Sequence, residues 1–497
     1  MGVTLGAGLS AAAAKAHPSA AAPAQAEVID LSLEPQLFVD DYLIAKTDGV
    51  FRTLNQPVKA PENPIIAPDQ PWEGFLALQP GTVLFDEKEQ RFKMWYNAMP
   101  RSNRPDVEEF ICYATSPDGV RWEKPNLGLV EFQGSKANNI VLKWCYWTIS
   151  VIHDLHDPDP GRRYKLAYWH TRDPKKCGVW VAFSPDGIRW TDHPHNPVVP
   201  CSASGDTFSV MQDPASKKYF LYHKTVVRPL RKVSRLVSDD FVVWRESRQV
   251  LEQDGQDQPD TEFYGLSAFP YAGQYLGLLW VFHTYTQFLD VQLASSRDGV
   301  AWERSAHRRI FIPLGFMRNN YSGQSFDSGM IYPASSPARK GDELWIYYSG
   351  FNHGHNLLEK EHTSRIGGAK LRLDGFCSLD ATSEGSVVTK FVRFEGSEMF
   401  VNAETGSIGP EGGKARPGWS QLFTGSPDGK GNVQVEIQDQ REVPIAGFRA
   451  SQCKPLQGNG VAQKVSWAGG NLGRLRNQAV RIKFVISNAK LYSFRVG

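Results

Sequence analysis

The feature that most constrains this chain is an internal repeat of short apolar strands that are rich in aromatic residues. Their starts lie 55 to 72 residues apart, a spacing typical of four-stranded propeller blades joined by variable loops. The five strands read FKMWY (92–96), YKLAYW (164–169), YFLYH (219–223), YLGLLWVF (275–282) and LWIYY (344–348). The repeat therefore predicts an all-β fold, with a five-bladed β-propeller over residues 35–375.

A second repeated element follows each of the first four strands. It reads close to Ser-x-Asp-Gly-x-x-Trp, at 116–122, 184–190, 238–244 and 296–302. Asp-Gly supplies the positive φ that a tight turn requires, the serine can hydrogen-bond the turn backbone, and the tryptophan can pack between blades. We therefore expect these residues to be structural.

The repeat ends near residue 376. Short alternating runs at 433–437, 480–486 and 491–496 predict a β-sandwich over residues 376–497. Residues 1–34 begin with an Ala-rich stretch that ends in Ala24-Gln25-Ala26, which fits a small-x-small cleavage site. We interpret residues 1–34 as an export-signal remnant or a disordered segment, and we expect a periplasmic or secreted protein.

Composition narrows the classes of function. The formal net charge of +2 gives no indication of nucleic-acid binding, and no run of 18 apolar residues could span a membrane. The six cysteines show neither Cys-x-x-Cys nor metal-ligand spacing, so they indicate single thiols, with one disulfide as an alternative. No cofactor is expected, although a structural cation such as calcium stays an alternative.

Acidic residues at the starts of the predicted inner strands are the candidates for catalysis, because these strands converge on the propeller axis. Asp206 precedes the third inner strand, Asp260 and Glu262 precede the fourth, and Asp327 precedes the fifth. Cleavage of a glycosidic bond needs one carboxylic acid for the leaving oxygen and a second carboxylate as base or nucleophile. We predict that Asp206, Glu262 and Asp327 form the catalytic set; the alternative is that each acid caps a loop or binds a cation.

Polar and aromatic side chains near these acids are expected to bind substrate. The cations among them could bind a carboxylated or sulfated sugar through charge-assisted hydrogen bonds. The expected substrate-binding residues are Glu73, Trp147, Asp260, Tyr264, Arg101, Arg318 and His353. His353 and His355 stand close together, but they lack further ligands for a metal site.

Three other aspartates recur at one position of the repeat and are expected to have a different role. Asp86, Asp154 and Asp213 end the first three inner strands, directly before a hairpin. Because aspartate side chains stabilise turns, we expect all three to be structural.

The blade repeats, the start LFVDDYLI (37–44), the strand KMWY (93–96), Asp206 and Asp327 make the chain resemble a known superfamily. It is similar to the five-bladed propeller glycosidases of glycoside hydrolase families 32 and 43 and their relatives, over nearly all of residues 35–497. The resemblance implies a glycosidase for an oligo- or polysaccharide, exo-acting because the funnel closes around a chain end.

The resemblance also implies roles for the acids. In those families, acids of blades one, two and three serve as base or nucleophile, transition-state helper and general acid. This chain has Gln79-Pro80-Gly81 in blade one where the first of these acids is expected, and blade two has no acid at the start of its inner strand. The assignment that remains is a shifted set, with Asp206 as base or nucleophile, Glu262 as acid and Asp327 as stabiliser; a lost activity is the alternative.

Three rival functions stay open at this point. A non-catalytic propeller could bind carbohydrate with the same aromatic and cationic side chains. A sialidase-like enzyme is suggested by the repeated turn, but it needs an arginine cluster and a tyrosine nucleophile that the sequence does not place. A glycoside phosphorylase would use the cationic loops to accept phosphate.

Overall fold

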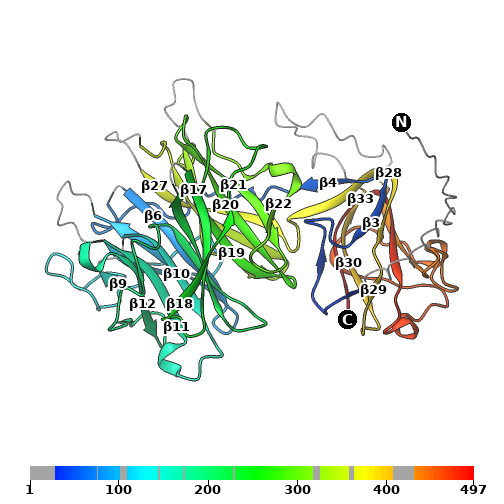
Figure 1. Cartoon of the computed structure of the whole chain (residues 1–497), viewed down its shortest axis with the longest axis horizontal. Helices are drawn as coiled ribbons and strands as arrows, with labels where there is room; N and C mark the ends of the chain where they lie inside the picture. The colour runs from blue at the N-terminus through cyan, green and yellow to red at the C-terminus, as the bar shows by residue number, and fades with distance from the viewer. Residues whose placement is uncertain are drawn as a thin grey trace, which may run out of the picture.

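Strands make up most of the described chain. The structure is a computed structural model that describes residues 28–74, 76–100, 109–143, 146–171, 174–227, 230–316, 325–356, 363–406 and 430–497. The helices within these ranges are short 3₁₀ segments at Pro160–Arg162, Pro174–Lys176, Ala306–Arg308, Ala450–Gln452 and Leu472–Leu475. The expected all-β class is thus confirmed (Figure 1).

Antiparallel units of four or five strands form the larger part of the molecule, and the last two units are joined into one ten-stranded sheet. The first unit contains β6 (Leu76–Asp86), β7 (Arg91–Met99), β8 (Phe110–Ser116) and β9 (Ile140–Lys143). The second contains β10 (Tyr146–His153), β11 (Tyr164–His170) and β12 (Gly178–Ser184), with β13 (Thr191–Asp192) and β14 (Val199–Pro200) both paired to β12. The third contains β15 (Phe208–Gln212), β16 (Tyr219–Val227), β17 (Leu230–Ser238) and β18 (Trp244–Leu251).

Two further units continue the series. The fourth contains β19 (Thr261–Tyr271), β20 (Gln274–His283) and β21 (Phe288–Ser296), edged by β22 (Trp302–Arg304) and β23 (Ile310–Ile312). The fifth contains β24 (Met330–Pro333), β26 (Glu343–Phe351) and β27 (Ser364–Arg372), with β25 (Ala338–Lys340) on β26. Its outermost strand is β5 (Val58–Lys59), which pairs with β27. The N-terminal part of the chain therefore completes the last unit.

Hydrogen bonds that involve buried serine and threonine residues link each unit to the next and link the fifth unit back to the first. Each link uses a serine or threonine that is at most 8% exposed. The links are Val151 N to Thr82 Oγ1 (2.8 Å), Val210 N to Ser150 Oγ (3.1 Å), Ser209 Oγ to the Leu266 carbonyl (2.6 Å), Ser267 Oγ to the Pro333 carbonyl (3.5 Å) and Ser335 N to the Gly81 carbonyl (2.9 Å). The inner strands are thus linked in chain order, and the fifth unit is linked back to the first; a propeller of five blades stays a prediction.

The repeated Ser-x-Asp-Gly element forms the expected turn. Ser116 Oγ accepts the Gly119 N–H at 2.8 Å, while Asp118 accepts the N–H groups of Val120 and Arg121 at 3.0 and 2.8 Å. Gly119 has a φ of 85°, which a residue with a Cβ rarely adopts. The structural role expected for this motif is confirmed.

A second sheet, which contains eight strands, lies beside the five units (Figure 1). Its C-terminal members are β28 (Cys377–Thr389), β30 (Met399–Thr405), β31 (Asn432–Gln438), β32 (Asn459–Lys464) and β33 (Arg481–Val496). The runs expected as two strands at 480–486 and 491–496 form the single strand β33, which is paired on both sides along most of its length. The sheet curls around its own apolar core, which includes Phe38, Val435 and Phe484.

The expected start of the propeller at residue 35 needs correction. The strands β2 (Gln36–Leu37), β3 (Ile44–Asp48) and β4 (Phe51–Leu54) pair with β33 or β28 of the second sheet, not with the five units. The short strand β1 (Ile29–Asp30) likewise pairs with β29 (Val392–Arg393). These segments are short and lack strict alternation, so only their partners, more than 300 residues away in the sequence, define them as strands.

Candidate active site

The structure brings two of the three predicted catalytic acids into one cluster on neighbouring units. Asp206, just before β15, lies 2.5 Å from the Nζ of Lys224 on β16. Glu262, at the start of β19, forms an ion pair with Arg231 on β17. The Asp206 side chain is 36% exposed and that of Glu262 is 8% exposed, so Asp206 is the more accessible acid.

Tyr264 connects these two ion pairs. The Lys224 Nζ lies 4.1 Å from the centroid of the Tyr264 ring, and the Arg231 guanidinium lies 5.5 Å from it. The position of the ring follows from a β-bulge, because the β19–β20 register shifts between Phe263 and Gly265 and leaves Tyr264 as the extra residue. Bulges next to binding sites commonly re-aim a side chain in this way.

Gly265 allows this bulge to pack. A Cβ at this position would lie 2.9 Å from Thr207 Cγ2 and 3.1 Å from the Trp280 ring, which is too close for a real side chain. The close approach of β19 to the start of β15 therefore depends on glycine, and it brings Glu262 and Tyr264 toward the segment that carries Asp206.

His355 extends the cluster toward the fifth unit. Its Nε2 lies 2.7 Å from the Tyr264 hydroxyl, and its backbone N–H donates to the Gln287 carbonyl at 2.8 Å. Burial lowers the pKa of His355, and the cations Arg231 and Lys224 lower it further. The imidazole is therefore neutral at neutral pH. One of its ring nitrogens can donate a hydrogen bond, and the other can accept one. Burial also lowers the pKa of Lys224, although Asp206 opposes that shift.

Asp327, the third predicted catalytic acid, lies elsewhere. Its Oδ2 accepts from Lys59 Nζ at 2.6 Å and from the Tyr348 hydroxyl at 2.9 Å, and its side chain is 3% exposed. Tyr348 belongs to β26, the second strand of the fifth unit, and Lys59 belongs to β5, its outermost strand. The side chain therefore points into its own unit, and the expectation that Asp327 joins the other two acids at the substrate is corrected.

The expectation that Glu73 binds substrate is also corrected, because its carboxylate is fully buried. It accepts from the Tyr96 hydroxyl at 2.7 Å, pairs with Lys124 at 2.8 Å and accepts the backbone N–H of Asp69 at 3.0 Å. With a side-chain exposure of 0%, it offers no surface to a substrate. It fastens the segment before β6 to the first unit.

The remaining residues that we expected to bind substrate lie at separate places in the structure. Trp147 lies at a register shift of β10 with a φ of 56°. Asp260 accepts the Thr284 N–H through its carbonyl at 2.9 Å, which links β19 to the loop after β20. His353 Nδ1 lies 2.8 Å from the Gly354 carbonyl. Arg101 and Arg318 lie outside the described residues.

The recurrent aspartates at the other ends of the inner strands have the expected structural role. Asp86 pairs with Lys93 at 2.8 Å, and Asp154 pairs with Lys165 at 3.2 Å. Asp213 accepts from the Tyr275 hydroxyl at 2.8 Å. These acids therefore stabilise turns and ion pairs, and the predicted structural role is confirmed.

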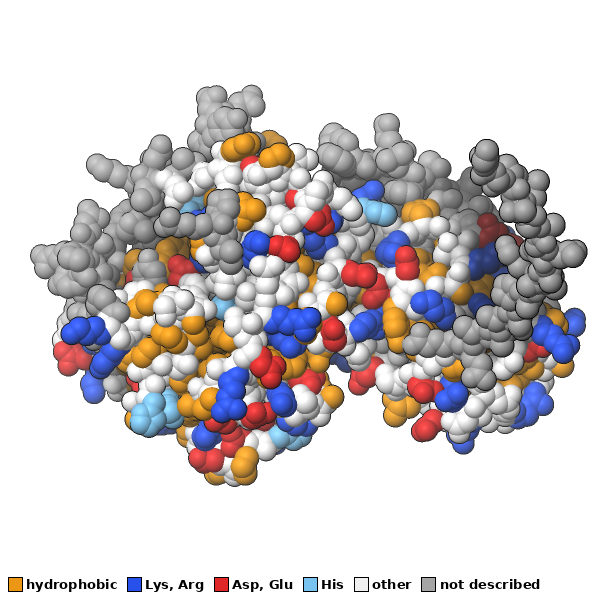
Figure 2. Space-filling view, in the orientation of Figure 1, with side chains coloured by type: hydrophobic (Ala, Val, Ile, Leu, Met, Phe, Trp, Pro, Cys, Tyr) orange, Lys and Arg blue, Asp and Glu red, His pale blue; other side chains and the backbone are white. Residues whose placement is uncertain are grey.

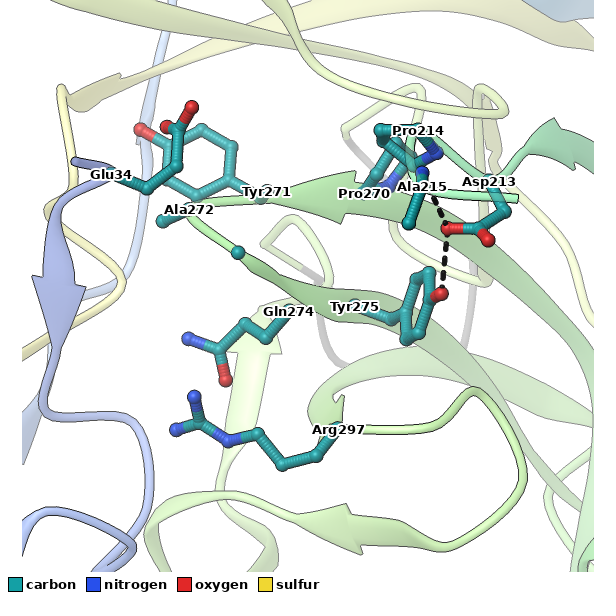
Figure 3. A pocket seen from close by; sticks show the side chains of 11 residues that line it. Glu34, Asp213, Pro214, Ala215, Pro270, Tyr271, Ala272, Gln274, Tyr275 and Arg297 are labelled. Atoms are coloured by element: carbon teal, nitrogen blue, oxygen red, sulfur yellow. Dashed lines mark hydrogen bonds between the residues drawn. The ribbon is translucent and has the colours of Figure 1, made fainter. Parts of the chain in front are cut away.

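A pocket of about 440 Å³ lies at this other end of the inner strands (Figure 3). It is lined by Asp213, by the β19–β20 turn around Tyr271 and Gln274, and by Glu34 and Arg297. Glu262 and Tyr271 mark opposite ends of β19, so the pocket and the acid cluster are roughly 30 Å apart along the strand. Its one inner-strand acid, Asp213, already has its partners.

Sequence reasoning missed Lys224 as a member of the site. The available signal was a lysine inside an otherwise apolar strand, in YFLYHKTVV, since a lysine is seldom buried without a partner. Glu109, next to β8, is a further acid that the sequence did not single out, and burial raises the pKa of its carboxyl to about 8.

Among the described residues, neither charged patches nor metal-ligating side chains mark a second site. Acidic and basic side chains are interspersed over the face seen in Figure 2, in keeping with the net charge of +2. Within the described ranges, no three His, Cys, Asp or Glu side chains come together as a metal site would require. No described helix has the length and apolar character needed to cross a membrane.

No protein-family model and no curated protein sequence matches the chain. Solved structures resemble it at low identity. One belongs to the GH130 family of mannoside phosphorylases, which contains glycoside hydrolases that target β-1,2-mannosidic linkages in Candida mannan; it is 16% identical, with a TM-score of 0.43, over 64% of this chain and 94% of that one.

Two other solved structures are similar to a comparable degree. An N-acetylgalactosamine deacetylase from F. plautii, bound to blood group B trisaccharide, is 16% identical with a TM-score of 0.44, over 65% of this chain and 96% of its own. A glycosyl hydrolase from Bacteroides ovatus is 16% identical with a TM-score of 0.43, over 64% and 94%. At this identity we carry no residue role over from them.

Proposed function

We propose that the protein is an enzyme that cleaves glycosidic bonds, with Asp206 and Glu262 as its reacting carboxylates. The observation that carries the proposal is their convergence from neighbouring units onto Tyr264. Two carboxylates in one cluster supply the acid and the base that hydrolysis of a sugar acetal needs, while the buried Tyr264 ring packs against their cationic partners. A carbohydrate-binding propeller would not need the paired acids.

Asp206 is assigned the role of base or nucleophile, because it is the more exposed of the two acids and is held by Lys224. Glu262 is assigned the role of general acid. A protonated Glu262 carries no charge to balance Arg231, so this role requires the ion pair to open when substrate binds. A substrate hydroxyl or anion that takes over Arg231 would couple binding to protonation of Glu262.

Phosphorolysis is the second candidate, favoured by the two cations within the cluster. Lys224 and Arg231 both lie next to Tyr264, and a bound phosphate could replace the carboxylates as their partner through charge-assisted hydrogen bonds. In that reaction phosphate, in place of water, attacks the anomeric carbon, and the acid protonates the leaving sugar oxygen.

Exo-action and export are further parts of the proposal. A five-bladed propeller would offer one central funnel to a chain end, and this expected geometry is the reason for proposing exo-action. The Ala-rich start of the sequence supports a periplasmic or secreted location.

A screen of the purified protein tests the proposal. Wild type and Glu262→Gln are incubated with neutral, uronic and sulfated oligosaccharides, with and without phosphate, and released sugars are measured. Release that depends on Glu262 supports hydrolysis, and release of a sugar phosphate only with phosphate supports phosphorolysis. Glu252→Gln, which alters an exposed pair with Lys232 on the neighbouring strand, is the matched control. Binding without any release would assign the protein to the carbohydrate-binding class.

A further inference from the structure

Cys177 and Cys201 lie opposite each other at the end of the short β12–β14 pairing in the second unit. The strands β12 and β14 pair Val179 with Val199 and Gly178 with Pro200. One step further in the same antiparallel register, Cys177 is opposite Cys201, and the Cys201 N–H donates to the Cys177 carbonyl at 3.0 Å. Directly opposed residues have Cβ atoms about 4.5 to 5.5 Å apart, close to the 3.5 to 4.5 Å that a disulfide needs.

The two side chains also interact and differ in accessibility. Burial, the adjacent Cys201 thiol and the Asp206 carboxylate together raise the pKa of the Cys177 thiol to about 12. Cys201 is exposed, Cys177 is half-buried, and Cys112, Cys377 and Cys453 are buried. Among the cysteines that the structure describes, this pair is therefore the one that a dissolved oxidant can reach.

The segment that begins at Cys201 leads directly to the candidate active site. It runs through Asp206 into β15, the inner strand of the third unit. Its far end is held by Lys224, because the Gly205 N–H donates to the Lys224 carbonyl at 2.9 Å and Asp206 pairs with the Lys224 ammonium. Its near end is held to β12 by the backbone hydrogen bond from Cys201 to Cys177 and by the pairing of β14 with β12.

We propose that Cys177 and Cys201 form an oxidation site, at which a small-molecule disulfide such as oxidised glutathione converts the two thiols into an intramolecular disulfide. The thiolate of exposed Cys201 attacks the oxidant, forming a mixed disulfide and releasing one glutathione. Cys177 then loses its proton to solvent and attacks the Cys201 sulfur, which releases the second glutathione. The protein loses two electrons and the oxidant gains them.

The link fixes the near end of the segment that carries Asp206. A cross-link between two strands restricts the unfolded chain more than the folded one, so oxidation raises the thermal midpoint. The second step requires the Cys177 thiolate. Because the pKa of Cys177 lies above this range, the thiolate fraction increases from pH 7 to pH 9, and the disulfide forms faster.

Mass spectrometry of the full chain tests the site. Reduced wild type is incubated with oxidised glutathione and digested without reductant. We expect one peptide that joins Cys177 to Cys201, a mass lower by two hydrogen atoms, and a thermal midpoint higher by a few degrees. Cys177→Ser should instead stop at a glutathione adduct on Cys201, with no gain in thermal midpoint, and Cys201→Ser should leave Cys177 unmodified.

Other outcomes would overturn the proposal. Wild type that accumulates only glutathione adducts would show that the two thiols do not meet. A cross-link from Cys201 to a different cysteine, or to a second molecule on a non-reducing gel, would show that exposure of Cys201 and not its pairing determines the chemistry. Neither result would bear on glycosidic cleavage, because the assay requires no sugar.

Discussion

Asp206 and Asp327 are a matched pair of acids with different surroundings. Both directly precede an inner strand, of the third and the fifth unit, and both pair with a lysine. Asp206 keeps 36% of its side chain exposed, whereas Asp327 keeps 3%. The difference arises from the partner, since Lys224 stands on the strand next to the inner strand and Lys59 on the outermost strand of its unit. Equivalent positions in a repeat can therefore have different surroundings, and we propose different roles for these two acids.

The largest expected effect concerns the lysine partners of these two acids. Lys224→Met removes the cation beside Asp206, and we expect kcat for the cleaved oligosaccharide to fall about 10³-fold, roughly 4 kcal/mol of transition-state stabilisation. Lys59→Met should leave kcat within about twofold, because Lys59 lies with Asp327 in the fifth unit. Steady-state kinetics of both variants measures the difference, and equal losses would contradict the assignment of separate roles.

A smaller effect is expected on stability when the buried acid is removed. Asp327→Ala leaves Lys59 without its partner and the Tyr348 hydroxyl without its acceptor, so the free energy of unfolding should fall by about 3 kcal/mol. Glu398→Ala breaks an exposed pair with Lys464 and should cost less than about 1 kcal/mol. Urea denaturation compares the two variants, and similar costs would show that Asp327 is not a structural acid.

A third prediction compares two neighbours on β16. Lys224 faces the cluster, and His223, on the opposite face of the strand, is completely buried without a hydrogen-bond partner in the described structure. Burial lowers the pKa of His223 from 6.5 to about 4. The unfolded chain therefore takes up a proton below pH 6.5 that the folded chain takes up only near pH 4, and stability falls as the pH decreases between these values.

Replacement of His223 tests that pH dependence. Between pH 6.5 and pH 4, the free energy of unfolding of His223→Leu should fall by roughly 3 kcal/mol less than that of wild type. His195→Leu changes an exposed histidine of the second unit and should leave the pH profile as it is. Unfolding in urea across this pH range gives the profiles. Parallel profiles for wild type and His223→Leu would show that His223 is not held neutral.

The parts of the fold that could be predicted are those with local signals. Aromatic strands and Ser-x-Asp-Gly turns carry their own periodicity and φ requirement, so the units and their hairpins follow from the sequence. The strands before residue 55 could not be assigned, because their partners are β28 and β33, far along the chain. Nothing local in Val58–Lys59 indicates that it completes the fifth unit.

The candidate site was predictable in part for a related reason. The places of Asp206 and Glu262 at the starts of inner strands can be read from the repeat, and their catalytic roles stay a proposal. The direction of the Asp327 side chain depends on Lys59, and that of Tyr264 depends on a bulge that Gly265 permits. Both are set by tertiary contacts that a single sequence does not specify.

The most direct test of the account compares Asp206→Asn with Asp327→Asn on the oligosaccharide that wild type cleaves. Each substitution removes one negative charge and keeps the shape of the side chain. The account predicts that Asp206→Asn lowers kcat by at least about 10²-fold with little change in the free energy of unfolding, and that Asp327→Asn does the reverse. Full activity of Asp206→Asn together with an inactive but stably folded Asp327→Asn would contradict it.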